Sequence, residues 1–321
     1  MKKKYIFAVI LLLLAAVPYG AWRHFNNKGP RTQVEIPAGT PAVKIADILK
    51  ENGIIQSRLF FKICLKLSGS APMLRSGTFL LNKNTSSIEA IWRLINDSGA
   101  MLYRVIIPEG WRIEEIAGEL QKNGITADNQ SFIDAAKTQE LEGYLFPSTY
   151  MLPKNMRPES LLSLMVSEYK NKVQPLILRA NTNMSERQVL TIASIVEREA
   201  VMHDERPKIA AVYLNRIKIG KRLEADPTVQ YALGWNAQEQ RHWKKGLTLK
   251  DLRLDSPYNT YRYGGIPPGP IANPGISSVE AVLHPEPGFD ALYFVADNTG
   301  RHVFSKTYNE HIQNIKNIRG R

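Results

Sequence analysis

The stretch Val189–Ala200, written VLTIASIVEREA, decides how the chain is organised, because it reads as one buried helix. At about 100° per residue, Leu190, Ala193 and Glu197 fall on one narrow stripe, and Arg198 lies on a separate polar arc. An ordinary surface glutamate would lie on the polar arc, whereas Glu197 lies among apolar positions. The pattern therefore predicts a helix that carries a carboxylate in a buried place.

A buried carboxyl group is suited to acid catalysis. Burial disfavours the charged form and raises the pKa, and a glutamic acid that is protonated near neutral pH can give a proton to a leaving-group oxygen. A second interpretation is a structural glutamate paired with an arginine, such as Arg216. Periodicity also leaves Glu199 open as the catalytic group, because on a helical wheel its side chain lies between those of Ile192 and Ile195. The helix by itself does not choose between Glu197 and Glu199.

The composition is that of a folded protein with an acidic partner. The chain has 321 residues, of which 44% are hydrophobic and 22% charged, and this length allows two domains. Its net charge of +12 suits nucleic acid, anionic lipid or the carboxylate-bearing peptides of a bacterial cell wall. The one cysteine, Cys64, excludes an intramolecular disulfide and a cysteine-based metal site, and we expect a buried structural thiol.

The N-terminus predicts a membrane anchor. Residues 1–4 form a basic tail, and the uncharged run 5–22 would span roughly 27 Å as a helix, enough for a bilayer core. The lysines favour a cytoplasmic N-terminus, and residues 23–32 read as a polar linker. A cleaved signal peptide is the alternative, but the run lacks small residues at the positions where cleavage needs them. In both cases the rest of the chain is exported, which argues against nucleic acid as the partner.

The exported part contains an internal repeat. Residues 34–54 read VEIPAGTPAVKIADILKENGI, and residues 105–125 read VIIPEGWRIEEIAGELQKNGI. The two stretches match at an offset of 71 positions, so that Val34 corresponds to Val105. Each copy reads as a strand, a Pro-x-Gly turn, a helix and an Asn-Gly helix stop. Small wall-binding LysM modules begin in this way, although a generic strand-turn-helix unit fits the second copy equally well. With the helices and short strands expected further on, this organisation predicts an α+β fold.

A rigid loop follows the central helix and its neighbours. Residues 254–275, LDSPYNTYRYGGIPPGPIANPG, are too rich in proline and glycine for a helix or a central strand. Tyrosine rings suit the C–H face of a sugar and asparagine amides suit its hydroxyl groups, so we expect Asn259, Tyr261 and Asn273 to hold glycan in a groove. A purely structural loop is the alternative. The sequence has no phosphate-binding loop and no histidine pattern for a metal, so no cofactor or metal is expected.

These motifs together resemble one family. The stretches ASIVEREA (193–200), VYLNRIKIGKRLEADPTVQYAL (212–233), SPYNTYRYGGIPPGPIANPG (256–275), EGYLFPSTY (142–150) and the terminal LHPEPG and LYFVAD are similar to motifs of the YceG-like, or MltG, family of endolytic murein transglycosylases. The resemblance covers nearly all of the exported chain. One departure is visible, because Ser148 stands where the family usually has an aspartate.

The resemblance implies a domain order and a site. It implies an anchor in the bacterial inner membrane, a LysM-like domain at 33–102 and a catalytic domain at 103–321 that lies in the periplasm and includes the second repeat. It also implies that the glutamate of the A-S-I-V-E motif is catalytic, which selects Glu197 over Glu199. The expected substrate is the glycan strand of peptidoglycan, without a cofactor, and wall synthases of the penicillin-binding class are implied as partners.

A lytic transglycosylase needs one carboxylate, unlike ordinary glycosidases. Glu197 would act as acid and then as base, leaving a 1,6-anhydro end on N-acetylmuramic acid, and Glu197→Gln would abolish cleavage. Two alternatives stay open. One is a muramidase that uses water, with Asp226 or Asp255 as the second carboxylate. The other is a non-catalytic scaffold that binds the wall and recruits synthases.

Overall fold

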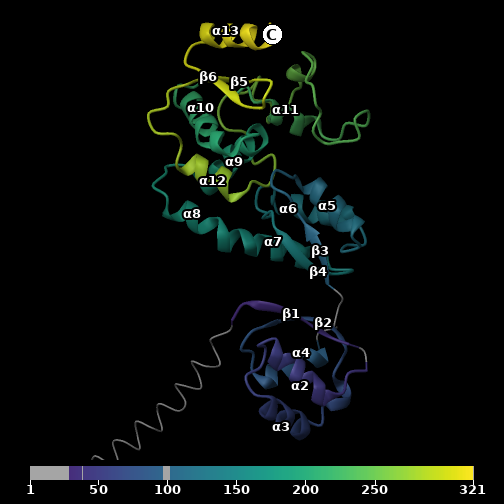
Figure 1. Cartoon of the computed structure of the whole chain (residues 1–321). Helices are drawn as coiled ribbons and strands as arrows, with labels where there is room; N and C mark the ends of the chain where they lie inside the picture. The colour runs from purple at the N-terminus through teal and green to yellow at the C-terminus, as the bar shows by residue number, and fades with distance from the viewer. Residues whose placement is uncertain (1–28, 38, 97–101, 321) are drawn as a thin grey trace, which may run out of the picture. The chain divides into compact units, whose positions relative to one another are not determined.

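The computed structural model describes residues 29–37, 39–96 and 102–320 and divides the chain into two compact units (Figure 1). The first unit ends at Leu102 and the second begins at Tyr103. Both contain helices and strands, which confirms the predicted α+β class. The sheets of the described residues are two-stranded, so each core is formed mainly by helices packed on a small sheet.

The first unit is built around an antiparallel strand pair. Strand β1 (Arg31–Ile36) pairs with β2 (Gly77–Asn82), with Val34 opposite Phe79, and both of these side chains are buried. Helices α2 (Ala42–Glu51), α3 (Arg58–Ser68) and α4 (Ser87–Asn96) complete the core. Cys64 is a partly buried free thiol on α3, rather than the fully buried one that the sequence predicted.

The second unit opens with the same succession of elements as the first. Strand β3 (Leu102–Ile106) is followed by α5 (Ile113–Lys122), α6 (Asn129–Thr138), β4 (Thr149–Pro153) and α7 (Pro158–Lys172), and β3 pairs with β4. The two copies of the predicted repeat thus form the same local structure. The same positions are buried in both copies: Val34 and Val105, Ile36 and Ile107, Ile45 and Ile116, Ala46 and Ala117, Leu49 and Leu120, and Ile54 and Ile125.

The structural repeat extends beyond the stretch recognised in the sequence. Gly53 and Gly124 end their helices with φ of 70° and 66°, a left-handed conformation that favours glycine. Asn84 and Asn155, also left-handed, donate their backbone N–H groups to the carbonyls of Gly53 and Gly124 at 3.1 and 3.3 Å. The second strand of each copy is therefore tied to the helix stop in the same way.

Helix α9 (Glu186–Glu199) is the centre of the rest of the second unit. It begins three residues earlier than predicted, because Ser185 and Gln188 form a capping box. Residues 189–196 are all buried, so the helix is covered on every side, by α10 (Arg206–Lys218), α12 (Ile276–Leu283) and neighbouring elements. The prediction of a buried helix is confirmed.

Two helical regions of the second unit are not indicated by the sequence patterns above. After β4 the chain forms two helices, α7 and α8 (Gln174–Arg179), because Pro175 cannot continue a helical hydrogen-bond ladder. Helix α12 was not predicted, although it contributes to the buried site described below. The remaining elements are α11 (Asp226–Leu233), β5 (Tyr293–Ala296), β6 (His302–Ser305) and α13 (Tyr308–Arg319).

The predicted basic tail, the predicted anchor over residues 5–22 and most of the linker lie outside the described residues. Arg31 and Thr32, which were predicted as the end of the linker, already belong to β1. Among the described residues, no helix has both the length and the apolar character needed to cross a bilayer.

Candidate active site

The last turn of α9 carries two glutamates that face different surroundings. Glu197 and Glu199 are two positions apart, so their side chains leave the helix about 200° from each other. Glu197 faces α10 and α12, and Glu199 faces a cavity beside α10, α11 and β5. The two candidates that periodicity left open are thereby separated in space.

Glu197 is held on both carboxylate oxygens. Oε1 accepts a hydrogen bond from the guanidinium of Arg206 at 2.9 Å, and Oε2 accepts from the hydroxyl of Ser278 at 2.7 Å and the backbone N–H of Gly275 at 3.0 Å. The side chains of Glu197 and Arg206 are each only 6% exposed. This is the arginine-paired arrangement that the sequence allowed, with Arg206 in place of Arg216. Both oxygens of this carboxyl group are thus occupied by protein donors.

The surroundings of Glu197 tie distant parts of the second unit together. Arg206 also donates to the Ser278 hydroxyl at 2.9 Å, so α9, α10 and α12 meet at one ion pair. The turn of the second repeat reaches the same place, because a Cβ at Gly275 would lie 1.9 Å from a carboxylate oxygen of Glu109. Burial, followed by the charge of Glu197, raises the pKa of Glu109. The cluster therefore has a structural role, because it holds α9, α10 and α12 together.

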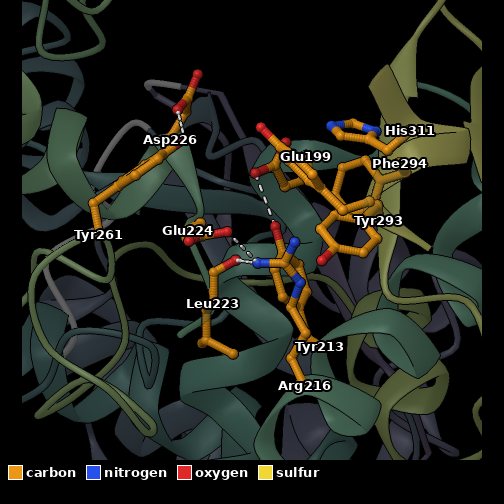
Figure 2. A pocket seen from close by; sticks show the side chains of 11 residues that line it. Glu199, Tyr213, Arg216, Leu223, Glu224, Asp226, Tyr261, Tyr293, Phe294 and His311 are labelled. Atoms are coloured by element: carbon orange, nitrogen blue, oxygen red, sulfur yellow. Dashed lines mark hydrogen bonds and ion pairs between the residues drawn. The ribbon is translucent and has the colours of Figure 1, made fainter. Parts of the chain in front are cut away.

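Glu199 lies in the wall of a cavity of about 310 Å³ (Figure 2). Its Oε1 accepts a hydrogen bond from the hydroxyl of Tyr213 at 2.9 Å. The cavity is lined mainly by acidic, aromatic and basic side chains, with one leucine, from five elements and the loops between them: Glu199, Tyr213, Arg216, Leu223, Glu224, Asp226, Tyr261, Tyr293, Phe294, Tyr308 and His311. Glu197 is not one of these residues.

The surroundings of Glu199 favour its protonated form. Burial raises its pKa to about 7, and the charge of Asp226 acts in the same direction, while Tyr213 and Arg198 act against it. Burial also raises the pKa of Tyr213 well above its ordinary value, so this hydroxyl stays a donor. A carboxyl group with a pKa near neutrality can give and take a proton at physiological pH, which is what general acid–base catalysis needs.

The other polar groups of the cavity differ in how far they are satisfied. Arg216 is used by the fold, because it donates to the carbonyls of Leu292, Arg222 and Leu223 and pairs with Glu224 at 2.9 Å. Asp226 accepts one hydrogen bond, from the hydroxyl of Tyr261 at 2.6 Å, and its side chain is exposed. The cavity therefore contains a cation that the fold already uses, Arg216, and an accessible carboxylate, Asp226.

The predicted glycan-binding residues separate into two groups. Tyr261 lines the cavity. Asn259 is completely buried and donates to the carbonyls of Leu252 and Leu254 at 3.0 and 2.8 Å, so it stabilises its own loop. Asn273 is also completely buried. The expectation that both amides hold glycan is therefore corrected, since neither can reach a ligand.

Asn273 joins the rigid loop to the second repeat. Its side-chain oxygen accepts from the N–H groups of Gly143 and Leu145 at 2.9 and 2.8 Å, and its amide donates to Glu142 at 3.0 Å. Burial raises the pKa of Glu142 to about 8, with Glu114 as a further cause in the same direction. The motif containing Glu142 is thus a structural contact of the loop, away from the residues that line the cavity.

The comparisons with known proteins agree with one another. A model of the YceG-like family matches residues 34–317. The chain is 35% identical over 304 residues to an endolytic murein transglycosylase of Bacillus subtilis (strain 168), covering 87% of this chain and 82% of the relative. It is 28% identical to an endolytic murein transglycosylase of Streptococcus pneumoniae serotype 2, covering 96% of this chain and 64% of the relative. A crystal structure of a YceG-like protein from Listeria monocytogenes matches with a TM-score of 0.53 at 31% identity, over 89% of this chain and 99% of the other.

Proposed function

Because the chain belongs to the YceG-like family, whose model matches residues 34–317, we propose that it is an endolytic murein transglycosylase. It cleaves the β-1,4 bond between N-acetylmuramic acid and N-acetylglucosamine within peptidoglycan strands and thereby ends their elongation. The relatives that carry this name support the proposal. The observation that carries it is a cavity with a carboxyl group whose pKa lies near neutrality, Glu199.

We assign the acid–base role to Glu199 rather than to Glu197. Glu199 is in contact with the cavity, and among the described residues its one side-chain donor is the Tyr213 hydroxyl, on Oε1. Glu197, the residue that the family motif favoured, has protein donors on both oxygens and a guanidinium beside it. To act as the acid, Glu197 would first have to be protonated, and this would leave the buried guanidinium of Arg206 without its anion, which is costly.

The proposed reaction proceeds with Glu199 alone as acid and base. Protonated Glu199 gives its proton to the bridging oxygen as the bond from that oxygen to C1 of muramic acid breaks. The resulting carboxylate then takes the proton of the muramic acid C6 hydroxyl, and O6 closes on C1 to form the 1,6-anhydro ring. The proton returns to Glu199, and no water is consumed.

Product analysis tests this function. The full chain in detergent is incubated with purified wall sacculi, and the soluble products are analysed by mass spectrometry. We expect anhydro-muropeptides from the wild type and none from Glu199→Gln. Products that are one water heavier would identify the water-using muramidase, and sacculus binding without any release by the wild type would identify the scaffold. Either result would overturn the proposal.

We further propose that residues 5–22 anchor the protein in the cytoplasmic membrane with both units outside the cytoplasm. The uncharged run after three lysines supports this placement. A LysM-like role in wall binding for the first unit and a partnership with wall synthases of the penicillin-binding class are part of the same proposal. Protease treatment of spheroplasts tests it, because digestion of both units in intact spheroplasts is expected and full protection would contradict it.

A further inference from the structure

We propose that Asp226 is a second catalytic carboxylate of this site, which stabilises the positive charge that develops at C1 of the muramic acid ring. The inference rests on the proposed function and deepens it. Asp226 forms no covalent bond and transfers no proton in this role. It acts through charge while Glu199 protonates the leaving oxygen.

The first argument is that the fold does not use this carboxylate as a helix cap. An aspartate before Pro227 reads in the sequence as an N-cap. In the structure the N-cap of α11 is Ala225, which has no capping side chain, and Asp226 is the first helical residue. Side-chain capping therefore does not account for this aspartate, which as a first-turn acid interacts with the helix dipole only.

The second argument is that Asp226 keeps an available oxygen on the cavity wall. Its Oδ1 accepts from Tyr261 at 2.6 Å, and within the described part of the chain no hydrogen bond is formed by Oδ2. Glu224 lines the same cavity but is neutralised by Arg216 at 2.9 Å. Among the described residues no cation forms an ion pair with Asp226, which distinguishes it from Glu224.

The third argument is the position of Asp226 relative to Glu199. Figure 2 shows Asp226 and Tyr261 on one side of Glu199, with Phe294 and His311 on the other. The charge of Asp226 is felt at Glu199, where it raises the pKa. One carboxyl group in a buried setting beside another in an exposed setting is the arrangement that lets the first act as an acid and the second as a stabilising anion.

The chemistry gives such an anion a purpose. When the bond from C1 to the bridging oxygen breaks, the ring passes through an oxocarbenium-like state that carries positive charge. The charge disappears when O6 closes on C1, so the anion stabilises the transition state more than the substrate. Groups of this kind change kcat rather than KM.

The test compares two aspartate–tyrosine pairs that have the same hydrogen-bond length. Asp255 accepts from Tyr263 at 2.6 Å, as Asp226 does from Tyr261, but neither Asp255 nor Tyr263 lines the cavity. We expect Asp226→Asn to lower kcat about 100-fold with little change in KM, and Asp255→Asn to stay within twofold of the wild type. Release of anhydro-muropeptides from sacculi by the full chain is the assay.

A hydroxyl deletion separates charge from structure. Tyr261→Phe keeps the charge of Asp226 and removes only its hydrogen bond, so we expect a loss of less than about fivefold in kcat. Equal losses in Tyr261→Phe and Asp226→Asn would identify a structural pair and overturn the proposal. If Asp226→Asn does not fold, as judged by circular dichroism and Tm, Asp226→Glu and Asp226→Gln replace it, and the charged variant must be the more active.

Two further outcomes separate failure of this inference from failure of the proposed function. If the wild type makes anhydro products and Asp226→Asn keeps kcat within twofold, only the role of Asp226 is overturned. If the wild type makes products that carry water, and Asp226→Asn abolishes them, then Asp226 is a general base and the transglycosylase proposal falls with it.

Discussion

Glu197 and Glu199 belong to the same turn of one helix, and their surroundings give them opposite properties. Glu197 accepts three hydrogen bonds, one of them from its ion-pair partner Arg206, and thereby joins three helices. Glu199 has the Tyr213 hydroxyl and a cavity, and burial brings its pKa to about 7. Burial alone therefore does not make a carboxyl group an acid catalyst. The groups that fill its lone pairs decide whether it can exchange a proton.

The largest expected effect is on catalysis. Glu199→Gln keeps the shape of the side chain but cannot give or take a proton, so we expect kcat for release of anhydro-muropeptides to fall at least about 1000-fold. The unfolding transition should stay cooperative, because no buried ion pair is broken. Loss of activity below tenfold would show that Glu199 is not the acid and would return Glu197 to that role.

The matching substitution at the other glutamate should act on stability. Glu197→Gln leaves the guanidinium of Arg206 buried without its anion, and we expect the free energy of unfolding to fall by about 3 kcal/mol. Urea denaturation measures this change, and the folded variant assayed at low temperature should keep activity within about tenfold. A Glu197→Gln protein that is as stable as the wild type but inactive would reverse the comparison.

The contrast between the two glutamates could be predicted only in part from the sequence. Periodicity identifies α9 as buried, and the repeat predicts the strand-turn-helix units, because both depend on residues close in the chain. The partners of Glu197 are the side chains of Arg206 and Ser278, and the latter lies on a helix that was not predicted. No local pattern reveals such partners. The position of a glutamate on a helix stripe therefore does not distinguish a structural ion pair from a catalytic carboxyl group.

The same limit explains the loop residues. A segment rich in proline, asparagine and tyrosine was predicted to line a groove, and Tyr261 does so. Asn259 and Asn273 instead form hydrogen bonds with backbone groups of loop segments, where no helix or strand provides partners for those groups. An amide that stabilises a loop and one that binds a sugar have the same letter in the sequence, and only the positions of neighbouring backbone groups distinguish them.

The pH dependence sharpens the comparison in a way that mutation alone does not. Protonated Glu199 is required as the acid, so kcat/KM should fall as the pH rises above about 7, approaching tenfold per pH unit. The charged and titratable groups that set this limit are Asp226, which raises the pKa, and Tyr213 and Arg198, which lower it. A pH profile that is flat from 6 to 9 would contradict the assignment.

Stability should follow the same titration. Below pH 4.5 Glu199 is protonated in both folded and unfolded chains, and as the pH rises the unfolded chain loses this proton first. The unfolded chain then binds fewer protons than the folded one, so stability falls until the folded group titrates near pH 7. Glu199→Gln removes this loss, so its stability advantage over the wild type should grow by about 3 kcal/mol from pH 4 to pH 8. Glu142, whose pKa is also raised, is present in both proteins and cancels.

The smallest expected effect concerns the hydroxyl that holds Glu199. Tyr213→Phe removes a donor that lowers the pKa of Glu199, so the alkaline limb of the pH profile should move to higher pH, and kcat should fall two- to fivefold as the carboxyl group loses its orientation. The matched control is Tyr169→Phe, because Tyr169 is also buried and donates to Glu186 at the other end of α9 at 2.8 Å. Both variants lose one tyrosine–glutamate hydrogen bond, so their stabilities should change alike. Only Tyr213→Phe should shift the pH profile, and a shift in both, or in neither, would mean that this hydrogen bond does not tune the acid.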